Sequence, residues 1–161
     1  MLGVKRLFQL AVEIYYFPLL IMEEFGFVLK KELDFAKIWI NSEYGIILID
    51  FLPYQTVGLK EAQILESNIL QLLDKEEKVF GITRLNDGSD MDDKARAYFA
   101  KCSLTVKHTK ALAAVFDNLG HRILYNVYLK INKPGIPMKG FANLQKAVNW
   151  LVEKKSIESL Q

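Results

Sequence analysis

The stretch that most constrains the fold of this chain runs from Lys110 to Leu151, KALAAVFDNLGHRILYNVYLKINKPGIPMKGFANLQKAVNWL. It opens with an apolar run over residues 111–116 and continues with a long apolar-rich helix that begins near Asn118. After a turn that contains proline come a short strand ending at Phe141 and a final amphipathic helix. The order strand, helix, strand, helix predicts parallel strands that are covered by helices.

Three short β-rich runs precede this stretch. They are FVLKKEL at 27–33, FAKIWIN at 35–41 and IILIDF at 46–51. The connections between them are hairpin-sized and consist of turn residues. The three runs are therefore predicted to form an antiparallel meander.

The middle of the chain links the meander to the later strands. A helix is predicted from Gly58 to about Asp74, and a strand at Val79–Thr83 then lies parallel to the third strand after a helical crossover. A second helix, from about Met91 to Lys101, follows a loop of turn residues. We therefore predict a single α/β domain over residues 22–161. Its mixed sheet has about six strands, antiparallel at first and then parallel, and about four helices cover it.

Composition agrees with one globular domain, because 51% of the 161 residues are hydrophobic and 25% are charged. The formal net charge of +2 is too small for a general polyanion binder. The charges are polarised along the chain: residues 61–93 hold nine acids against three bases, whereas residues 104–140 hold six bases against one acid. The basic part lacks the clustered aromatic residues of an RNA-stacking platform, so we expect no nucleic-acid partner.

Residues 1–21 are an apolar extension with two basic residues near its start. Glu13 and Pro18 interrupt the run before it reaches the ~20 apolar residues of a transmembrane helix, and no A-x-A-like cleavage site follows. Three interpretations remain open. The segment is an extension translated from a start site upstream of a natural start at Met22, an amphipathic accessory helix that packs on a partner or membrane surface, or an uncleaved anchor.

No common catalytic or cofactor fingerprint is present. The chain lacks G-x-S-x-G, a P-loop and G-x-G-x-x-G after a strand. His108 and His121 are thirteen residues apart and the acids are scattered, so we expect no metal site and no cofactor. The single cysteine, Cys102, excludes an intrachain disulfide and fits a reducing compartment. Asp50, at a strand end, could serve as a general base, but a turn or rim role is the simpler interpretation.

The helix after Asn118 carries the candidate ligand-binding residues. Its apolar arc consists of Leu119, Ile123, Leu124, Val127, Tyr128 and Ile131. A helix with so much apolar surface is either buried or covered by a partner or lipid. Arg122 and Asn126 are stacked four residues apart and could tie the helix to neighbouring loops. Alternatively, Arg122 and Lys130, with Lys133 in the following turn, hold a phosphate or carboxylate.

Ser89 is the candidate for phosphorylation. It precedes the helix expected from Met91, whose terminal N–H groups favour an anion. Four aspartates between residues 87 and 93 surround it with like charge, so a role as a turn residue or helix cap is the alternative.

The strand order and the acidic loop before the second main helix resemble the STAS fold, the anti-sigma-factor-antagonist type of α/β domain. More closely, four segments are similar to a group of small STAS-like bacterial proteins that has no established activity. They are DDKARAYFA, the K-A-L-A strand at Lys110, HRILYNVYLKINKP and the terminal A-V-N-W-L. The likeness covers most of Phe27–Lys155.

The resemblance implies a regulator, because the founding STAS proteins are switched by phosphorylation of Ser or Thr in a D-S-[ST]-G motif at a helix start. The comparable loop here reads N-D-G-S-D, with Ser89 as its only hydroxyl and no glycine after it. Sec14-like lipid-binding domains are more distant structural relatives of this family and imply a different class of ligand.

These observations predict a non-enzymatic STAS-like regulatory or protein-interaction module of the bacterial cytoplasm. We expect its partner to be another protein, or a second copy that pairs its acidic face with the basic one. The alternative is a carrier for a small apolar or anionic, lipid-like ligand between the long helix and the sheet, with Arg122 and Lys130 at its head group. We do not expect a membrane partner.

Overall fold

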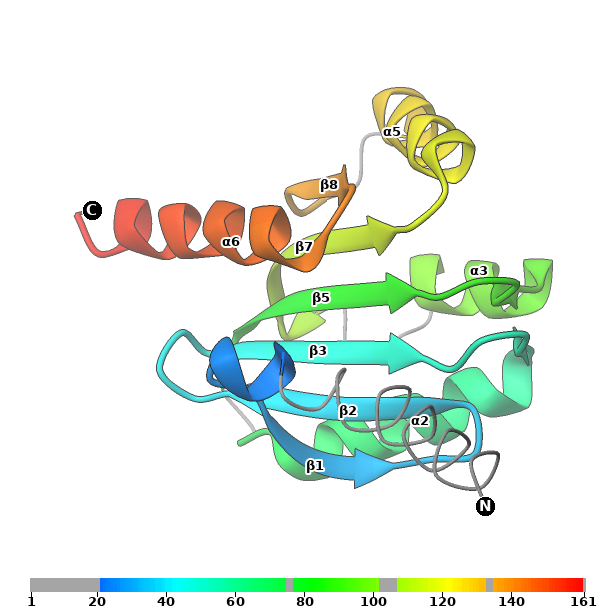
Figure 1. Ribbon diagram of the computed structural model, residues 1–161, viewed down its shortest axis with the longest axis horizontal. Helices are drawn as coiled ribbons and strands as arrows, with labels where there is room; N and C mark the ends of the chain where they lie inside the picture. Colours follow the sequence, from blue (N-terminus) through cyan, green and yellow to red (C-terminus); the bar gives the residue numbers. More distant parts are fainter. Residues whose placement is uncertain (1–20, 75–76, 102–106, 133–134, 161) are drawn as a thin grey trace, which may run out of the picture.

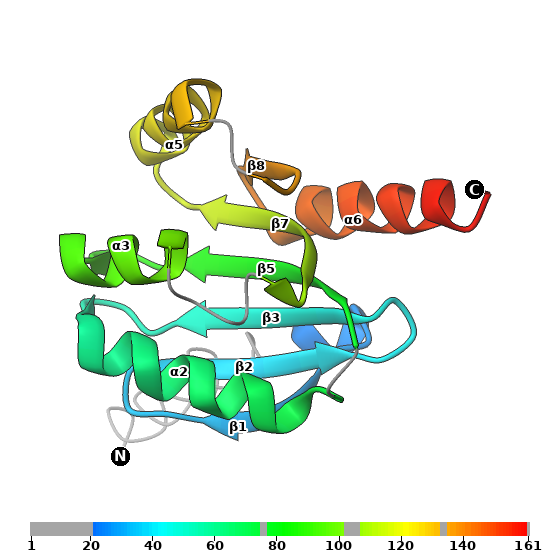
Figure 2. The ribbon, with the colours of Figure 1, turned by 180° about the vertical axis from the view of Figure 1, so that it is seen from behind.

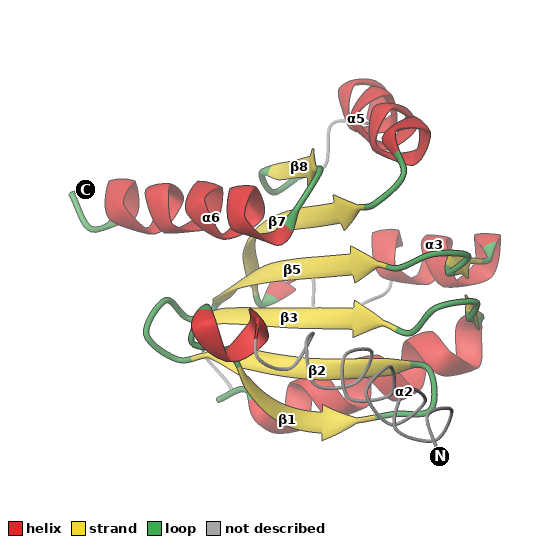
Figure 3. Cartoon of the chain, viewed as in Figure 1, coloured by secondary structure: helices red, strands yellow, loops and turns green. Residues whose placement is uncertain are grey.

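The computed structural model describes residues 21–74, 77–101, 107–132 and 135–160, and its main feature is one six-stranded sheet (Figure 1). In spatial order, its strands are β1 (Val28–Glu32), β2 (Ala36–Asn41), β3 (Ile46–Phe51), β5 (Val79–Leu85), β7 (Thr109–Phe116) and β8 (Met138–Phe141). The longer helices are α2 (Leu59–Leu72), α3 (Asp93–Lys101), α5 (Leu119–Asn132) and α6 (Leu144–Glu158). Figure 3 distinguishes the helices from the strands by colour.

The sheet is antiparallel at one end and parallel at the other. β2 pairs antiparallel with both β1 and β3. From β3 onward each neighbour is parallel, through β5 and β7 to β8. Because parallel strands need a crossover, α2, α3 and α5 each lie between two successive parallel strands in the sequence. The predicted mixed α/β architecture is thereby confirmed.

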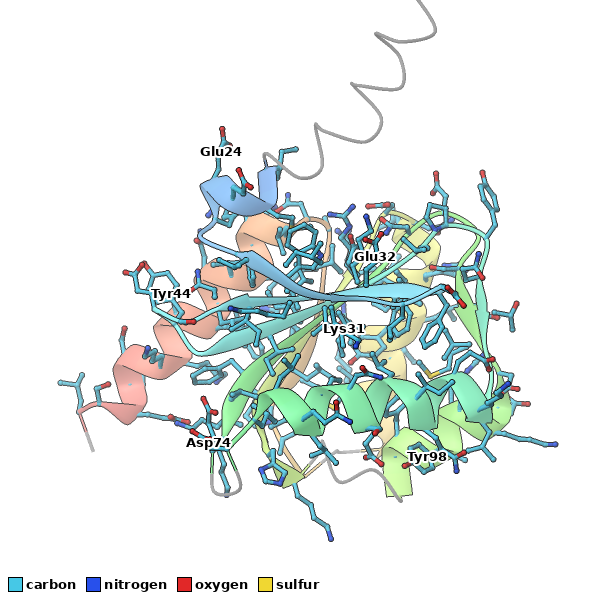
Figure 4. The ribbon with its side chains drawn as sticks, turned by 90° about the horizontal axis from the view of Figure 1, so that it is seen from below. Glu24, Lys31, Glu32, Tyr44, Asp74 and Tyr98 are labelled. Atoms are coloured by element: carbon cyan, nitrogen blue, oxygen red, sulfur yellow. The ribbon has the colours of Figure 1, made fainter. Side chains whose placement is uncertain are left out.

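Helices pack on both faces of the sheet. α6 lies on one face (Figure 1), and α2 and α3 lie on the other (Figure 2). Successive side chains of β3 point to opposite faces of the sheet and so enter two different cores. Ile46 and Leu48 belong to the core beneath α6, and Ile47 belongs to the core beneath α2. On the second face Tyr98 of α3 lies beside α2 (Figure 4), and its hydroxyl donates to the Glu66 carboxylate.

Two helix starts are closed by hydrogen bonds to their N-terminal backbone groups. The backbone N–H of Gly58, at the N-cap of α2, donates to the Glu61 carboxylate at 3.1 Å. At the start of α6 the side chain of Asn143 caps the helix, because its oxygen accepts from the backbone N–H of Lys146 at 3.0 Å.

A second, very small sheet was not predicted. β4 (Thr56–Val57) and β6 (Asp90–Met91) pair parallel over two residues each. Met91 therefore lies in a strand and does not begin the second helix. That helix, α3, starts at Asp93, and Asp92 caps it by accepting from the backbone N–H of Ala95 at 2.7 Å. Two-residue strands have no periodicity that a sequence pattern could reveal.

The two edge strands differ from the central ones. β1 forms one edge, where Lys30, Lys31 and Glu32 are exposed and the pairing with β2 shifts register between Leu29 and Lys31. β8 forms the other edge and has only four residues. The hydrogen-bonding pattern of the sheet is thus interrupted by a register shift at the β1 edge, and it is short at the β8 edge.

The predictions for the N-terminal extension fall on residues 1–20, which lie outside the described residues. Met22 is fully buried and belongs with Phe27 to the core beneath α6. Within the described residues, no helix has the length and apolar character needed to cross a membrane.

The two neighbouring positions Leu65 and Ile64 test the orientation of α2. Leu65 is buried in the core, whereas Ile64 is partly exposed. Leu65→Ala should therefore lower the free energy of unfolding by about 3 kcal/mol, because a cavity replaces packed methyl groups. Ile64→Ala should lower it by less than about 1 kcal/mol. Urea denaturation followed by circular dichroism measures both changes, and equal losses would contradict the packing of α2.

Candidate functional site

The inner face of α5 is half-buried and holds this helix against the edge of the sheet. The ring of Tyr125 lies 5.1 Å from that of Phe116 at the end of β7. The side-chain oxygen of Asn126 accepts from the backbone N–H of Gly140 in β8 at 3.0 Å. A Cβ atom at Gly140 would lie 3.2 Å from Tyr125 and 3.3 Å from Asn126, so the helix packs closely on β8. Asn126 therefore ties α5 to a strand, where the sequence suggested a neighbouring loop.

The outer face of α5 is exposed. Four large apolar side chains, Leu119, Ile123, Leu124 and Val127, are between 46% and 67% exposed. They belong to the apolar arc that the sequence predicted to be buried or covered. The side chains of Tyr128 and Ile131 lie outside what the structure describes. Within the described part of the chain no element covers this arc, because α5 packs on β7 and β8 through its opposite face.

A shallow, wide-open hollow of about 480 Å³ lies between α5, β8 and α6. Three cationic side chains line it, one from each element: Arg122, Lys139 and Lys146. Its other lining residues include Glu153 and Trp150 of α6. The charged side chains of the hollow are therefore three cations and one acid, at a place where three elements meet.

The structure separates the residues that the sequence grouped as an anion site. Arg122 lines the hollow, while Asn126 is engaged with β8. Lys130 is exposed and does not line the hollow. Lys133 lies outside the described residues. Lys139 and Lys146 were missed because only the parallel pairing of β8 and the position of α6 bring them beside Arg122.

Asp50 is the centre of a second polar cluster, at the carboxyl end of β3. The residue is 7% exposed, and its carboxylate lies 3.1 Å from the Arg84 guanidinium of β5. The side chain of Asn86 donates to the same carboxylate oxygen at 2.8 Å and accepts from Arg84 at 3.0 Å. Burial raises the pKa of Asp50, and the nearby Arg84 and Asn86 offset this only in part.

The Asp50 cluster continues a row of charges across four strands. Glu32 lies opposite Lys37, Lys37 opposite Asp50, and Asp50 opposite Arg84. Glu32 and Lys37 form an ion pair at 3.0 Å. In Figure 4 Glu32 lies on the side of the sheet away from α2. Because Asp50 is paired with Arg84 and Asn86, its observed contacts join β3 to β5 and provide no free general base.

Ser89 lies in the loop between β5 and β6. The residue is 7% exposed, and its hydroxyl donates to the backbone carbonyl of Asn86 at 2.6 Å. The preceding Gly88 has φ +66°, and a Cβ atom there would lie 2.4 Å from the ring of Tyr54, which covers this turn. Ser89 is thus a buried turn residue, and Asp92 caps α3 in its place. Phosphorylation of Ser89 would require this loop to open.

A mixed six-stranded sheet whose parallel strands are joined by helices defines a STAS-like α/β domain, as predicted. A solved structure supports this class of fold: an uncharacterized protein from the DUF3478 family of Shewanella loihica, described as having a SpoIIAA-like fold. It is 12% identical, has a TM-score of 0.53, and is matched over 78% of this chain and 91% of its own. Residues 38–155 match the family model described as Domain of unknown function (DUF7793), and the chain belongs to this family. A search of curated proteins found no match.

Replacing Arg84 by Met tests the Asp50 cluster. A buried carboxylate that loses its cation should lower the free energy of unfolding at pH 7.5 by about 2 kcal/mol. The pKa of Asp50 in the folded protein is raised above its unfolded value of 3.8. Its contribution to the free energy of unfolding is therefore fully present below pH 3.8 and is lost as the pH rises through the folded pKa. Arg84→Met raises that folded pKa further. The deficit should therefore be largest at pH 7.5 and shrink towards pH 4.5, as urea denaturation at both pH values measures.

The double variant Asp50→Asn, Arg84→Met is the control. It removes the buried charge together with its partner, so the pH-dependent part of the deficit should disappear. A deficit in Arg84→Met that is the same at both pH values would show that lost packing, and not the unpaired carboxylate, causes it.

Proposed function

We propose that this protein is a non-enzymatic STAS-like regulatory or interaction module of the bacterial cytoplasm, and that it binds a protein partner through the outer face of α5. The observation that supports the proposal is the exposure of Leu119, Ile123, Leu124 and Val127 on one side of one helix. Contiguous apolar side chains on a protein surface are typical of binding sites, because water solvates them poorly.

Charge indicates what kind of partner fits this face. The sequence of α5, LGHRILYNVYLKIN, contains two permanent cations and no acid. Lys130 lies beside the apolar side chains on the outer face. Two copies of α5 packed on each other would bring like charges together, whereas an amphipathic segment with acidic flanks would be complementary. We therefore favour a different protein over a second copy of the same helix.

The alternative function, a small-molecule carrier, also has an observation in its favour. The hollow beside Arg122 offers a concave surface between the long helix and the sheet. Its cationic side chains favour an anionic ligand over an apolar one, because burying a charge against an apolar ligand would leave it unpaired. Lys130 is not part of its lining, so Arg122 would meet the anionic group without it.

Leu124→Glu tests the protein-binding proposal. The side chain is largely exposed, so the change should leave the stability within about 0.5 kcal/mol of the original protein. A carboxylate in the apolar face should weaken binding of an acid-flanked partner by about tenfold or more. Proteins retained from a lysate of the native host by the original chain and by the variant are compared quantitatively by mass spectrometry.

Ile157→Glu is the matched control, because Ile157 of α6 is 50% exposed but lies outside the α5 face. A partner retained by the original protein and by Ile157→Glu, and lost with Leu124→Glu, is the expected result. If every retained protein binds both variants equally, the outer face of α5 is not the interaction surface. Sedimentation of the same three proteins at increasing concentration shows whether the partner is a second copy.

A further inference from the structure

We propose that the hollow between α5, β8 and α6 binds the phosphate group of a phosphate monoester. Arg122, Lys139 and Lys146 supply three cations from three different elements, against the single carboxylate of Glu153. The proposal goes beyond protein binding because it uses Arg122 and residues of β8 and α6, and none of the four exposed apolar residues of α5.

The three cations are available for a ligand. No carboxylate among the described residues lies within 4.0 Å of any of them, since the ion pairs of this part of the chain involve other residues. Lys139 is placed over the ring of Phe141 at 5.4 Å, an attraction that leaves its ammonium donors free. Three cations against the one carboxylate of Glu153 leave a net positive charge around the hollow, which a bound anion would offset.

The close packing of α5 on β8 fixes the geometry of the hollow. Arg122 lies one turn before Asn126 on the inner side of the helix, and Asn126 is hydrogen-bonded to the backbone of Gly140. Gly140 follows Lys139 in β8 and also lines the hollow. The same contact that attaches α5 to the sheet therefore brings the Arg122 guanidinium to the side of the helix where Lys139 lies.

The number and type of cations favour a phosphate monoester over a carboxylate. A guanidinium group can donate two parallel hydrogen bonds to a phosphate, and two ammonium groups can balance its second negative charge. The first turn of α6, which carries Lys146, contains no acid. The positive end of this helix dipole therefore adds to the attraction for an anion. A carboxylate would carry only one charge among three cations.

The test titrates the intact protein with inorganic phosphate at constant ionic strength and follows the backbone amides of Lys139, Gly140 and Lys146 by NMR. Arg122→Ala should weaken binding by about tenfold. Glu153→Gln should tighten it about threefold, because one repulsive charge is removed. An improvement of this kind is not expected from a variant that merely disturbs the fold.

Lys60→Ala is the matched control, because it removes one exposed cation from α2 on the other side of the sheet. It should change the phosphate affinity less than about twofold. Absence of a saturable shift at the three amides would overturn the proposal, and so would equal losses in Arg122→Ala and Lys60→Ala. Leu124→Glu should bind phosphate normally, so failure of this proposal and failure of the protein-binding proposal are distinguishable.

The source of the phosphate monoester is resolved by two further probes. Glycerol 3-phosphate represents a free metabolite, and phosphatidylcholine vesicles with and without phosphatidic acid represent a lipid head group. Saturable binding of either probe that is weakened by Arg122→Ala supports the site and names its source. If neither probe binds, the hollow does not recognise phosphate monoesters.

Discussion

The burial of β3 on both faces is the constraint on which the other elements depend. This strand has antiparallel β2 on one side and parallel β5 on the other, so it is the point where the two halves of the sheet meet. Alternate residues of β3 enter different cores, and each core needs its own helical cover. α6 and the pair α2 and α3 supply these covers, and that leaves α5 to pack at the margin beside β8. The outer face of α5 is thus exposed because the helix packs at the edge of the sheet and not over one of the two cores.

The same strand carries a buried carboxylate. Asp50 precedes the core residue Phe51, and its carboxylate is removed from water but held by Arg84 and Asn86. The cluster connects the antiparallel half of the sheet to the first parallel strand. Its groups are occupied with one another, in contrast to the three cations of the hollow, which face no carboxylate within ion-pair distance.

Most of the fold was predictable because its strands and helices are long enough to have a period. The alternation in AKIWIN and the apolar spacing of α2 each indicated the correct element, and Gly58 marked the start of α2. β4 and β6 were missed because each has only two residues. Whether α5 is buried could not be predicted. An apolar arc indicates that a helix packs against something, but it does not indicate whether that neighbour belongs to the same chain.

The candidate site was predicted only in part, and for a related reason. Arg122 was recognised from its position on a helix, where residues four apart are neighbours. Lys139 and Lys146 lie 17 and 24 residues later, and only the packing of three elements brings them to Arg122. Ser89 stood out because its loop has turn chemistry. Its hydroxyl donates to the backbone carbonyl of Asn86 in the same loop, and a sequence pattern does not record this contact.

The margins of the sheet determine how this protein can be recognised. Many domains bind an extended peptide by adding it as a further strand, which requires a long edge with unpaired and regularly spaced backbone groups. Here one edge carries three consecutive charged residues beside a shift in register, and the other has only four residues. Such edges discourage the addition of strands, whether from a partner or from aggregating copies of the chain. Recognition through side chains on helices is the route that this architecture leaves open.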